Sequence, residues 1–119
     1  MIGLPSSVRI YLATETVDLR KGPDGLSALV KRAFDAEVFS GHLFVFLSRR
    51  SDRVKIIWWD RGGYVVYYKR LERGRFRAPQ LTADARTVTM TAAELSSLLE
   101  GIDISKARRT KLWEPNSKS

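Results

Sequence analysis

Apolar residues recur along the chain with two different periods, and each period predicts one type of secondary structure. Residues 8–12 alternate apolar and polar-tolerant side chains, which predicts a short strand. Pro23 is well placed for the first turn of a helix. From Leu26 to Phe34 the apolar residues return at three- and four-residue spacing, which predicts an amphipathic helix over about residues 24–37.

Three apolar runs follow in residues 42–70, separated by short polar turns. Residues 42–47, 53–59 and 64–69 are rich in β-branched and aromatic side chains, which predicts three strands. The turns between them span about four residues, which is too few for the crossover that parallel strands need. The pattern therefore predicts an antiparallel meander.

A second helix is predicted toward the C-terminal end. Thr91 and Glu94 have the spacing of a capping box, in which each side chain bonds the backbone of the other residue. Leucines at 95, 98 and 99 then form a short apolar face, and Gly101 is a suitable stop. These signals predict a helix over about residues 92–100, preceded by a further short strand over 88–90.

These elements predict an α+β fold, in which two helices pack against a mainly antiparallel sheet. A chain of 119 residues falls within the commonest size for one domain, and we expect that domain to span residues 1–105. Residues 106–119 are basic and rich in polar residues, so we expect them to form a frayed tail.

Positive charge is concentrated in one part of the chain. The sequence carries 21 Lys and Arg against 13 Asp and Glu, a net charge of +8, and Arg is twice as frequent as Lys. Residues 49–77 alone hold ten basic residues and three acidic ones. Arg binds phosphate through two parallel hydrogen bonds and also stacks on bases, so this segregation indicates a polyanionic partner. Charge that merely keeps the protein in solution is the alternative.

The candidate nucleic-acid-binding residues are the basic side chains of this segment and two that precede the first predicted helix. They are Arg20, Lys21, Arg49, Arg50, Arg53, Lys55, Arg61, Lys69, Arg70, Arg73, Arg75 and Arg77. A helix N-terminus attracts anions, which favours Arg20 and Lys21 as binding residues. An ordinary loop held by an ion pair between Asp18 and Arg20 is the alternative, and the sequence does not decide between the two.

Trp58 and Trp59 lie in the predicted strand at 53–59, where alternation places them on opposite faces. One face of that strand must pack in the core, so the other presents an aromatic ring among Lys and Arg, as in sheets that hold nucleic acid. Aromatic residues in strands are more often packed than exposed, and Ile57 on the same face as Trp59 favours packing. The predicted binding surface is therefore made by the arginines.

The sequence lacks the side chains on which common enzyme sites depend. It has no Cys and a single His, His42, at the start of an apolar strand, which leaves no thiolate site and no catalytic triad. Five Asp residues have the look of exposed turn or loop acids, and no acidic residues are grouped as the metal pair of a nuclease requires; the five are Asp18, Asp24, Asp52, Asp60 and Asp84. We therefore expect a protein without enzymatic activity, cofactor or metal.

Targeting signals are also missing from the sequence. No apolar run approaches the length of a membrane span, and the N-terminus does not have the pattern of a signal peptide. We expect a cytoplasmic protein without a membrane partner. The sequence leaves the oligomeric state open.

Several blocks of the sequence, taken in order, point to a known family. They are residues 18–26 (DLRKGPDGL), 41–46 (GHLFVF), 52–60 (DRVKIIWWD), 69–76 (KRLERGRF) and 98–103 (LLEGID). With these blocks in a chain of this size, the sequence resembles the TnpB-type accessory proteins of the insertion-sequence-66 family. Those proteins are encoded by the second open reading frame of these bacterial transposable elements, and they are unrelated to the RNA-guided nucleases that share the TnpB label.

The resemblance implies a role in DNA transposition, beside a separate and much larger DDE-type transposase. The leading hypothesis is a non-catalytic accessory protein that binds DNA through an Arg-rich surface. The alternative is an interaction module that docks on the transposase, or on another partner, through the same basic face and without contacting DNA.

Overall fold

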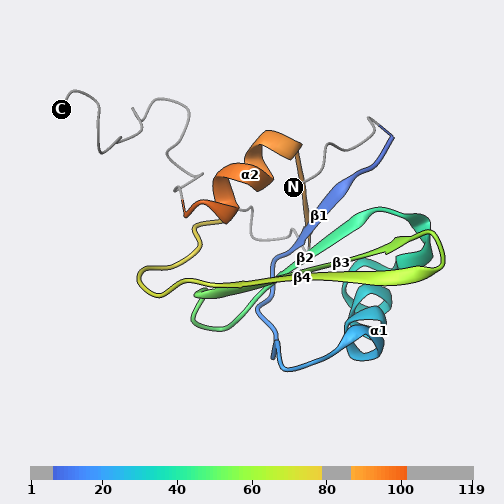
Figure 1. Ribbon diagram of the computed structural model, residues 1–119, viewed down its shortest axis with the longest axis horizontal. Helices are drawn as coiled ribbons and strands as arrows, with labels where there is room; N and C mark the ends of the chain where they lie inside the picture. Colours follow the sequence, from blue (N-terminus) through green and yellow to red (C-terminus); the bar gives the residue numbers. More distant parts are fainter. Residues whose placement is uncertain (1–6, 79–86, 102–119) are drawn as a thin grey trace.

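The computed structural model describes residues 7–78 and 87–101 (Figure 1). In chain order these residues form β1 (Ile10–Ala13), α1 (Pro23–Phe34), the 3-10 helix η1 (Val38–Ser40), β2 (Leu43–Leu47), β3 (Arg53–Asp60), β4 (Gly63–Arg70), β5 (Thr87–Met90) and α2 (Ala92–Leu99). Both predicted helices and all five predicted strands are present. The predicted tail at 106–119 and the domain boundary at 105 lie outside the described residues.

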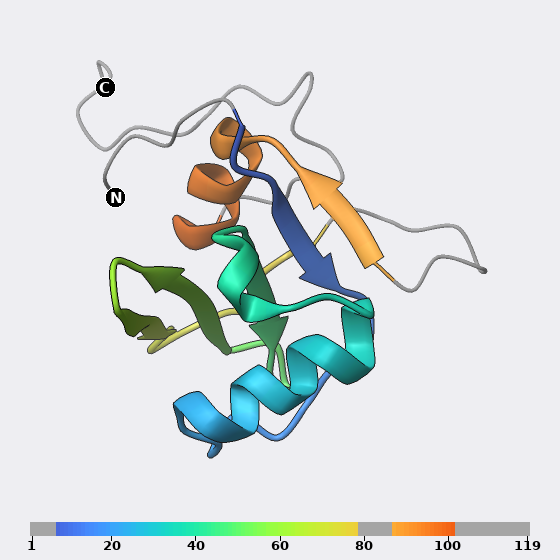
Figure 2. The same ribbon diagram turned by 90° about the vertical axis from the view of Figure 1, so that its right-hand side faces the viewer.

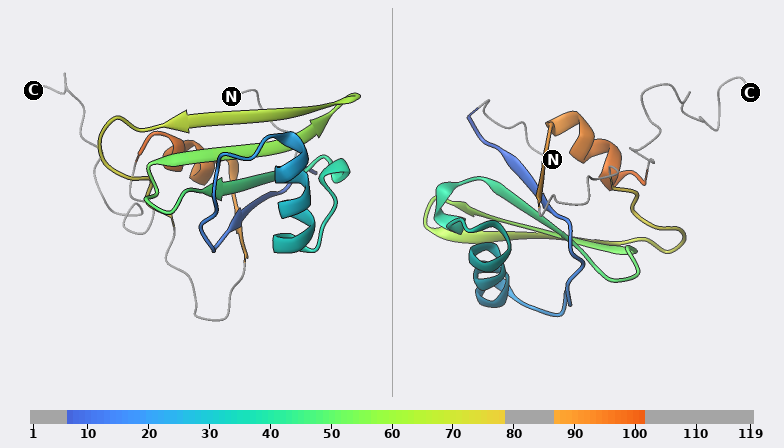
Figure 3. Two further views of the ribbon diagram at one scale, coloured as in Figure 1. Left: turned by 90° about the horizontal axis from the view of Figure 1, so that it is seen from below. Right: turned by 180° about the vertical axis from the view of Figure 1, so that it is seen from behind.

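The five strands form one sheet in the order β4-β3-β2-β1-β5. The predicted antiparallel meander is formed by β2, β3 and β4, and β5 pairs antiparallel with β1. By contrast, β1 and β2 are parallel, because the chain between them crosses over through α1. The α+β fold class with a mainly antiparallel sheet is confirmed, and β4 lies along one edge (Figure 3, left).

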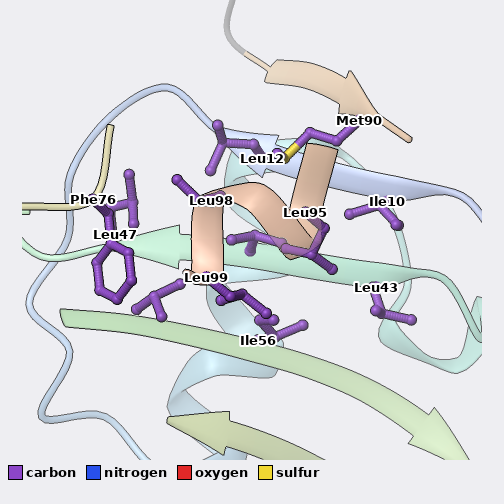
Figure 4. Close-up of a cluster of buried hydrophobic side chains, with 12 residues drawn as sticks. Ile10, Leu12, Leu43, Leu47, Ile56, Phe76, Met90, Leu95, Leu98 and Leu99 are labelled. Atoms are coloured by element: carbon purple, nitrogen blue, oxygen red, sulfur yellow. The ribbon is translucent and has the colours of Figure 1, made fainter. Parts of the chain in front are cut away.

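The two helices cover opposite faces of this sheet, so each face has its own apolar core (Figures 1 and 2). The core under α2 includes Leu43, Ile56, Leu95, Leu98 and Leu99 (Figure 4). The core under α1 includes Leu26, Leu29, Val30, Phe44, Phe46 and Ile57. Because β2 is covered on both sides, all five of its residues are buried.

Local backbone chemistry sets the ends of the two helices. At the start of α2, Glu94 N–H donates to Thr91 Oγ1 at 3.0 Å and Thr91 N–H donates to Glu94 Oε1 at 2.8 Å, which is the predicted capping box. The first helix ends earlier than predicted, because Asp35 adopts a left-handed conformation (φ 50°) and its N–H closes on the carbonyl of Lys31. The chain then enters η1, which the sequence analysis did not predict.

The hairpin between β3 and β4 has a two-residue turn, shorter than predicted. Arg61 and Gly62 both have positive φ, at 41° and 87°, as a type I′ turn requires. The resulting register pairs Trp59 with Tyr64 and Trp58 with Val65. Both tryptophans are half-buried, Trp58 against the core under α2 and Trp59 against the rings of neighbouring aromatics, which agrees with the interpretation of these rings as packed.

Candidate nucleic-acid interface

The turn between β2 and β3, residues 48–53, is called the arginine turn here. Ser51 N–H donates to the carbonyl of Ser48 at 2.9 Å, which places Arg49 and Arg50 at the two central positions of a β-turn. Ser48 Oγ also donates to Asp52 Oδ1 at 3.1 Å and accepts from Arg53 N–H at 3.1 Å. The acidic side chain of this turn is therefore hydrogen-bonded within the turn itself, while both central arginines are exposed.

Three guanidinium groups of the arginine turn have no carboxylate in ion-pair contact within the described residues. These are the side chains of Arg49, Arg50 and Arg53. Arg53 also lies directly opposite Arg70 in the β3–β4 register, and like charges in that position repel each other. Arg70 is partly neutralised by Glu72, whose carboxylate is 3.2 Å from its guanidinium. A bound anion would relieve the repulsion that remains.

The loop before α1 is fixed beside the arginine turn by the parallel crossover. Val17 N–H donates to the carbonyl of Leu47 at 3.0 Å, at the end of β2. Lys55 Nζ, on β3, donates to the carbonyl of Lys21 at 2.8 Å. The fold therefore brings residues 17–22 next to residues 48–55, two segments far apart in the sequence.

Asp18 and Arg20 form the ion pair that the sequence analysis had considered. Arg20 Nη2 lies 2.7 Å from Asp18 Oδ2, and Arg20 backbone N–H donates to Asp18 Oδ1 at 3.0 Å. These hydrogen bonds hold the pKa of the Asp18 carboxyl well below its usual range and raise the pKa of Arg20. Arg20 is thus both paired in its loop and exposed at the candidate interface.

The lowered pKa of Asp18 leads to a test by NMR. The Asp18 carboxyl signal is expected not to move as the pH falls through about 3.9, where an unperturbed Asp titrates. Because the pKa of Asp18 is lowered in the folded state, its ionised carboxyl stabilises the fold fully above the unfolded-state pKa. This stabilisation is lost as the pH falls through the folded-state pKa. In Arg20→Ala the pKa of Asp18 is expected to rise toward the usual value but to stay below it, because the backbone N–H of residue 20 still donates to Asp18 Oδ1. An ordinary titration of Asp18 in the unaltered protein would contradict the ion pair.

A concave region, called the basic hollow here, lies between the loop before α1, the arginine turn and the strands β3 and β4. Its volume is about 960 Å³. Its charged lining residues are Asp18, Arg20, Arg49, Arg50, Asp52, Arg53 and Lys55. Five basic and two acidic side chains give it a formal net charge of +3. Asp18 forms an ion pair with Arg20 and Asp52 accepts a hydrogen bond from the neutral hydroxyl of Ser48, so the net charge of the hollow stays positive.

Lys21 is exposed in the loop before α1 and does not line the hollow, and five further predicted site residues fall into two groups. Arg73, Arg75 and Arg77 are exposed in the loop after β4, and this loop is held against the arginine turn because Leu71 and Phe76 N–H groups donate to the carbonyls of Asp52 and Ser51. These three arginines therefore extend the basic surface beyond the hollow.

Arg61 and Lys69 depart from the single surface that the sequence analysis expected. Arg61 lies in the β3–β4 turn, eight residues or roughly 25 Å along the strand from Arg53. Lys69 lies on the other face of the sheet, and its Nζ donates to the carbonyl of Leu99 at the end of α2 at 2.6 Å. Strand alternation is the physical reason, because Lys69 pairs with Val54, whose side chain lies in the core under α2.

Two aromatic side chains are more exposed than the sequence analysis expected. Tyr68 lines the basic hollow and is 50% exposed, and Lys55 Nζ lies 5.5 Å from the centre of its ring. Phe39, in η1, is 57% exposed and contacts the ring of Trp59 at 4.9 Å between centroids. Strand alternation assigns Tyr68 to one face of its strand, but the exposure of Phe39 depends on η1, which no pattern in the sequence predicts.

His42 has a structural role, as its position at the start of an apolar strand suggested. Its Nδ1 accepts a hydrogen bond from Arg9 N–H at 3.0 Å, which links β1 to the start of β2. Across residues 7–78 and 87–101, no three His, Cys, Asp or Glu side chains lie together as a metal ion would need. No helix in the same residues is both long and apolar enough to cross a bilayer.

Comparison with known proteins links the chain to one family. The family described as "IS66 Orf2 like protein" matches residues 8–109. Two relatives from Sinorhizobium fredii (strain NBRC 101917 / NGR234) are each 38% identical to the chain. The protein y4jC aligns over 115 residues, 97% of this chain and 97% of its own, and y4hO over 114 residues, 94% of this chain and 96% of its own. Both are described as uncharacterized, and no solved structure matches the chain significantly.

Proposed function

Because the chain belongs to the IS66 Orf2-like family, we propose that it is a non-catalytic accessory protein of DNA transposition that binds DNA through the basic hollow and the arginines around it. Family membership indicates the accessory role in transposition. What we propose beyond this role is that the protein binds DNA and acts beside a separate transposase in the cytoplasm. The match over residues 8–109 includes every residue of the hollow.

The observation that carries the proposal is the unpaired positive charge of the arginine turn. Arg49 and Arg50 project from a turn whose backbone is fixed by hydrogen bonds, and Arg53 follows at the start of β3. The backbone of the turn is therefore ordered before a ligand binds, and the planar donors of a guanidinium match two oxygens of a phosphate. Phosphate groups spaced along a DNA backbone supply several such acceptors at once.

The hydrogen-bond partners of the nearby acidic residues support an anionic ligand for the arginine turn. Most of the nearby carboxylates are engaged: Asp18 by Arg20, Asp52 by Ser48 and Glu72 by Arg70. None of these pairs involves the three guanidinium groups of the arginine turn. A surface whose charge served only to keep the protein in solution would gain nothing from leaving three clustered arginines unpaired, because like charges so close together repel each other.

Salt dependence of DNA affinity tests this function. Fluorescence anisotropy with a labelled duplex and a labelled single strand, at increasing salt, is expected to show a linear fall of log K with log salt. Three phosphate contacts to duplex DNA would give a slope of about −2.7. The absence of binding to either DNA at low salt would overturn the proposal. Co-purification with the transposase from DNA-free preparations would then favour docking of the basic face on an acidic partner surface.

A further inference from the structure

We propose that the basic hollow takes an unpaired nucleotide of a DNA strand, so that the protein prefers single-stranded DNA or an unpaired strand end to uninterrupted duplex. This inference rests on the proposed function and deepens it, because it names the form of DNA that the site accepts. It depends on three features that lie together in the hollow: an exposed aromatic ring, unpaired cations and a concave shape.

The aromatic feature is Tyr68, on the edge strand β4. Half of this side chain is exposed although it lies in a strand, and its ring forms part of the wall of the hollow. The neighbouring ammonium group of Lys55 lies 5.5 Å from the ring centre and is tethered to the carbonyl of Lys21. An exposed ring beside cations is the arrangement with which proteins stack a base and hold its phosphate.

The second feature is how the cations lie around that ring. Tyr68 and Lys55 face each other across β3 and β4, and Arg53 and Arg70 form the adjacent pair of the same ladder on the same face. Arg49 and Arg50 line the hollow from the arginine turn. A base on the ring of Tyr68 would thus lie close to several basic side chains that can contact the neighbouring phosphates.

The third feature is the shape of the site. A volume of about 960 Å³ lies within the range of clefts that enclose small molecules. In a duplex the bases are paired and stacked inside the helix, so that only phosphates and groove edges would reach the hollow and the ring of Tyr68 would have no base to stack on. An unpaired nucleotide can enter such a cleft and use both the ring and the cations.

The apolar part of the lining agrees with a base as the occupant. Val17, Leu19 and Val66 are among the residues that line the hollow. Free phosphate would gain nothing from these side chains or from the ring, whereas a base offers an apolar face to both. A free nucleotide carries the same base and phosphate as a nucleotide of a DNA strand, and the competition experiment below distinguishes these two ligands.

The test compares a single-stranded oligonucleotide with the duplex of the same sequence, for the unaltered protein and three variants. Tyr68→Ala is expected to weaken single-strand affinity about five-fold or more, the effect of losing one stacked base, and to weaken duplex affinity much less, because a duplex offers the ring no base to stack on. Tyr68→Phe keeps the ring and is expected to retain binding. Phe39→Ala removes an equally exposed ring outside the hollow and serves as the matched control. Thermal melting of each variant checks that the fold is kept.

The possible outcomes separate this inference from the proposed function. Preference for the single strand, lost in Tyr68→Ala and kept in the other two variants, supports the inference. Equal affinity for both DNAs with no effect of Tyr68→Ala overturns it while leaving DNA binding intact, and binding to neither DNA overturns both. Displacement of the single strand by dTMP at matched nucleotide concentration would also overturn it, because the hollow would then be a site for a free nucleotide.

Discussion

Replacement of Arg49, Arg50 and Arg53 together by alanine is expected to lower DNA affinity at low salt on the order of 100-fold or more, because three charge-assisted contacts to phosphate are lost. The slope of log K against log salt is expected to become shallower by about 2.7 for duplex DNA. All three side chains are exposed and without an ion pair in the described residues, so the free energy of unfolding is expected to change by no more than about 0.5 kcal/mol for each substitution.

The matched control for this variant removes the same charge elsewhere. Arg9, Arg32 and Arg61 are also exposed, and none of them lines the basic hollow. Their joint replacement by alanine lowers the net charge by the same three units, so any loss that comes only from overall charge would appear equally in both triple variants. Equal losses would contradict a localised site, whereas a loss confined to the arginine turn would assign binding to it. Anisotropy measures affinity, and urea unfolding checks the stability of both variants.

The secondary structure could be predicted because its signals are local. The capping box of Thr91 and Glu94 fixes the start of α2 by hydrogen bonds within four residues, and strand alternation sorts Val54 and Ile57 onto opposite faces as observed. The turn at residue 61 was predicted too long. Positive φ at Arg61 is unusual for a residue with a side chain, so the pattern favoured the two glycines that follow as the centre of the turn.

The position of each basic side chain was harder to predict than the concentration of positive charge in residues 49–77. Strand alternation places Lys69 and Arg70 on opposite faces of β4. Deciding which of them faces the arginine turn requires the β3–β4 register, and this register depends on the two-residue turn. The hollow itself depends on the parallel pairing of β1 with β2, which brings Asp18 and Arg20 beside the arginine turn. That contact is between distant segments, and no periodicity within either segment encodes it.

The basic loop after β4 reads as charge alone in the sequence, whereas the one side chain that is buried within residues 71–78 decides where that charge lies. Phe76 is 2% exposed and belongs to the core under α2 (Figure 4), while Arg75 and Arg77 on either side of it are exposed. Its N–H donates to the carbonyl of Ser51 at 2.6 Å. One aromatic ring thus holds the loop against the arginine turn.

Phe76→Ala is therefore expected to lower the free energy of unfolding by about 3–5 kcal/mol, the usual cost of removing a buried Phe side chain. Against a typical domain stability of about 5–15 kcal/mol, this is a large share of the total. Urea unfolding measures the loss. Phe76→Leu keeps most of the apolar volume and is expected to lose less, and Arg75→Ala, beside it on the surface, is expected to stay within about 0.5 kcal/mol of the unaltered protein. A loss from Phe76→Ala no larger than that from Arg75→Ala would mean that the ring does not anchor the loop, and the arginines at 73, 75 and 77 would then have no fixed place beside the hollow.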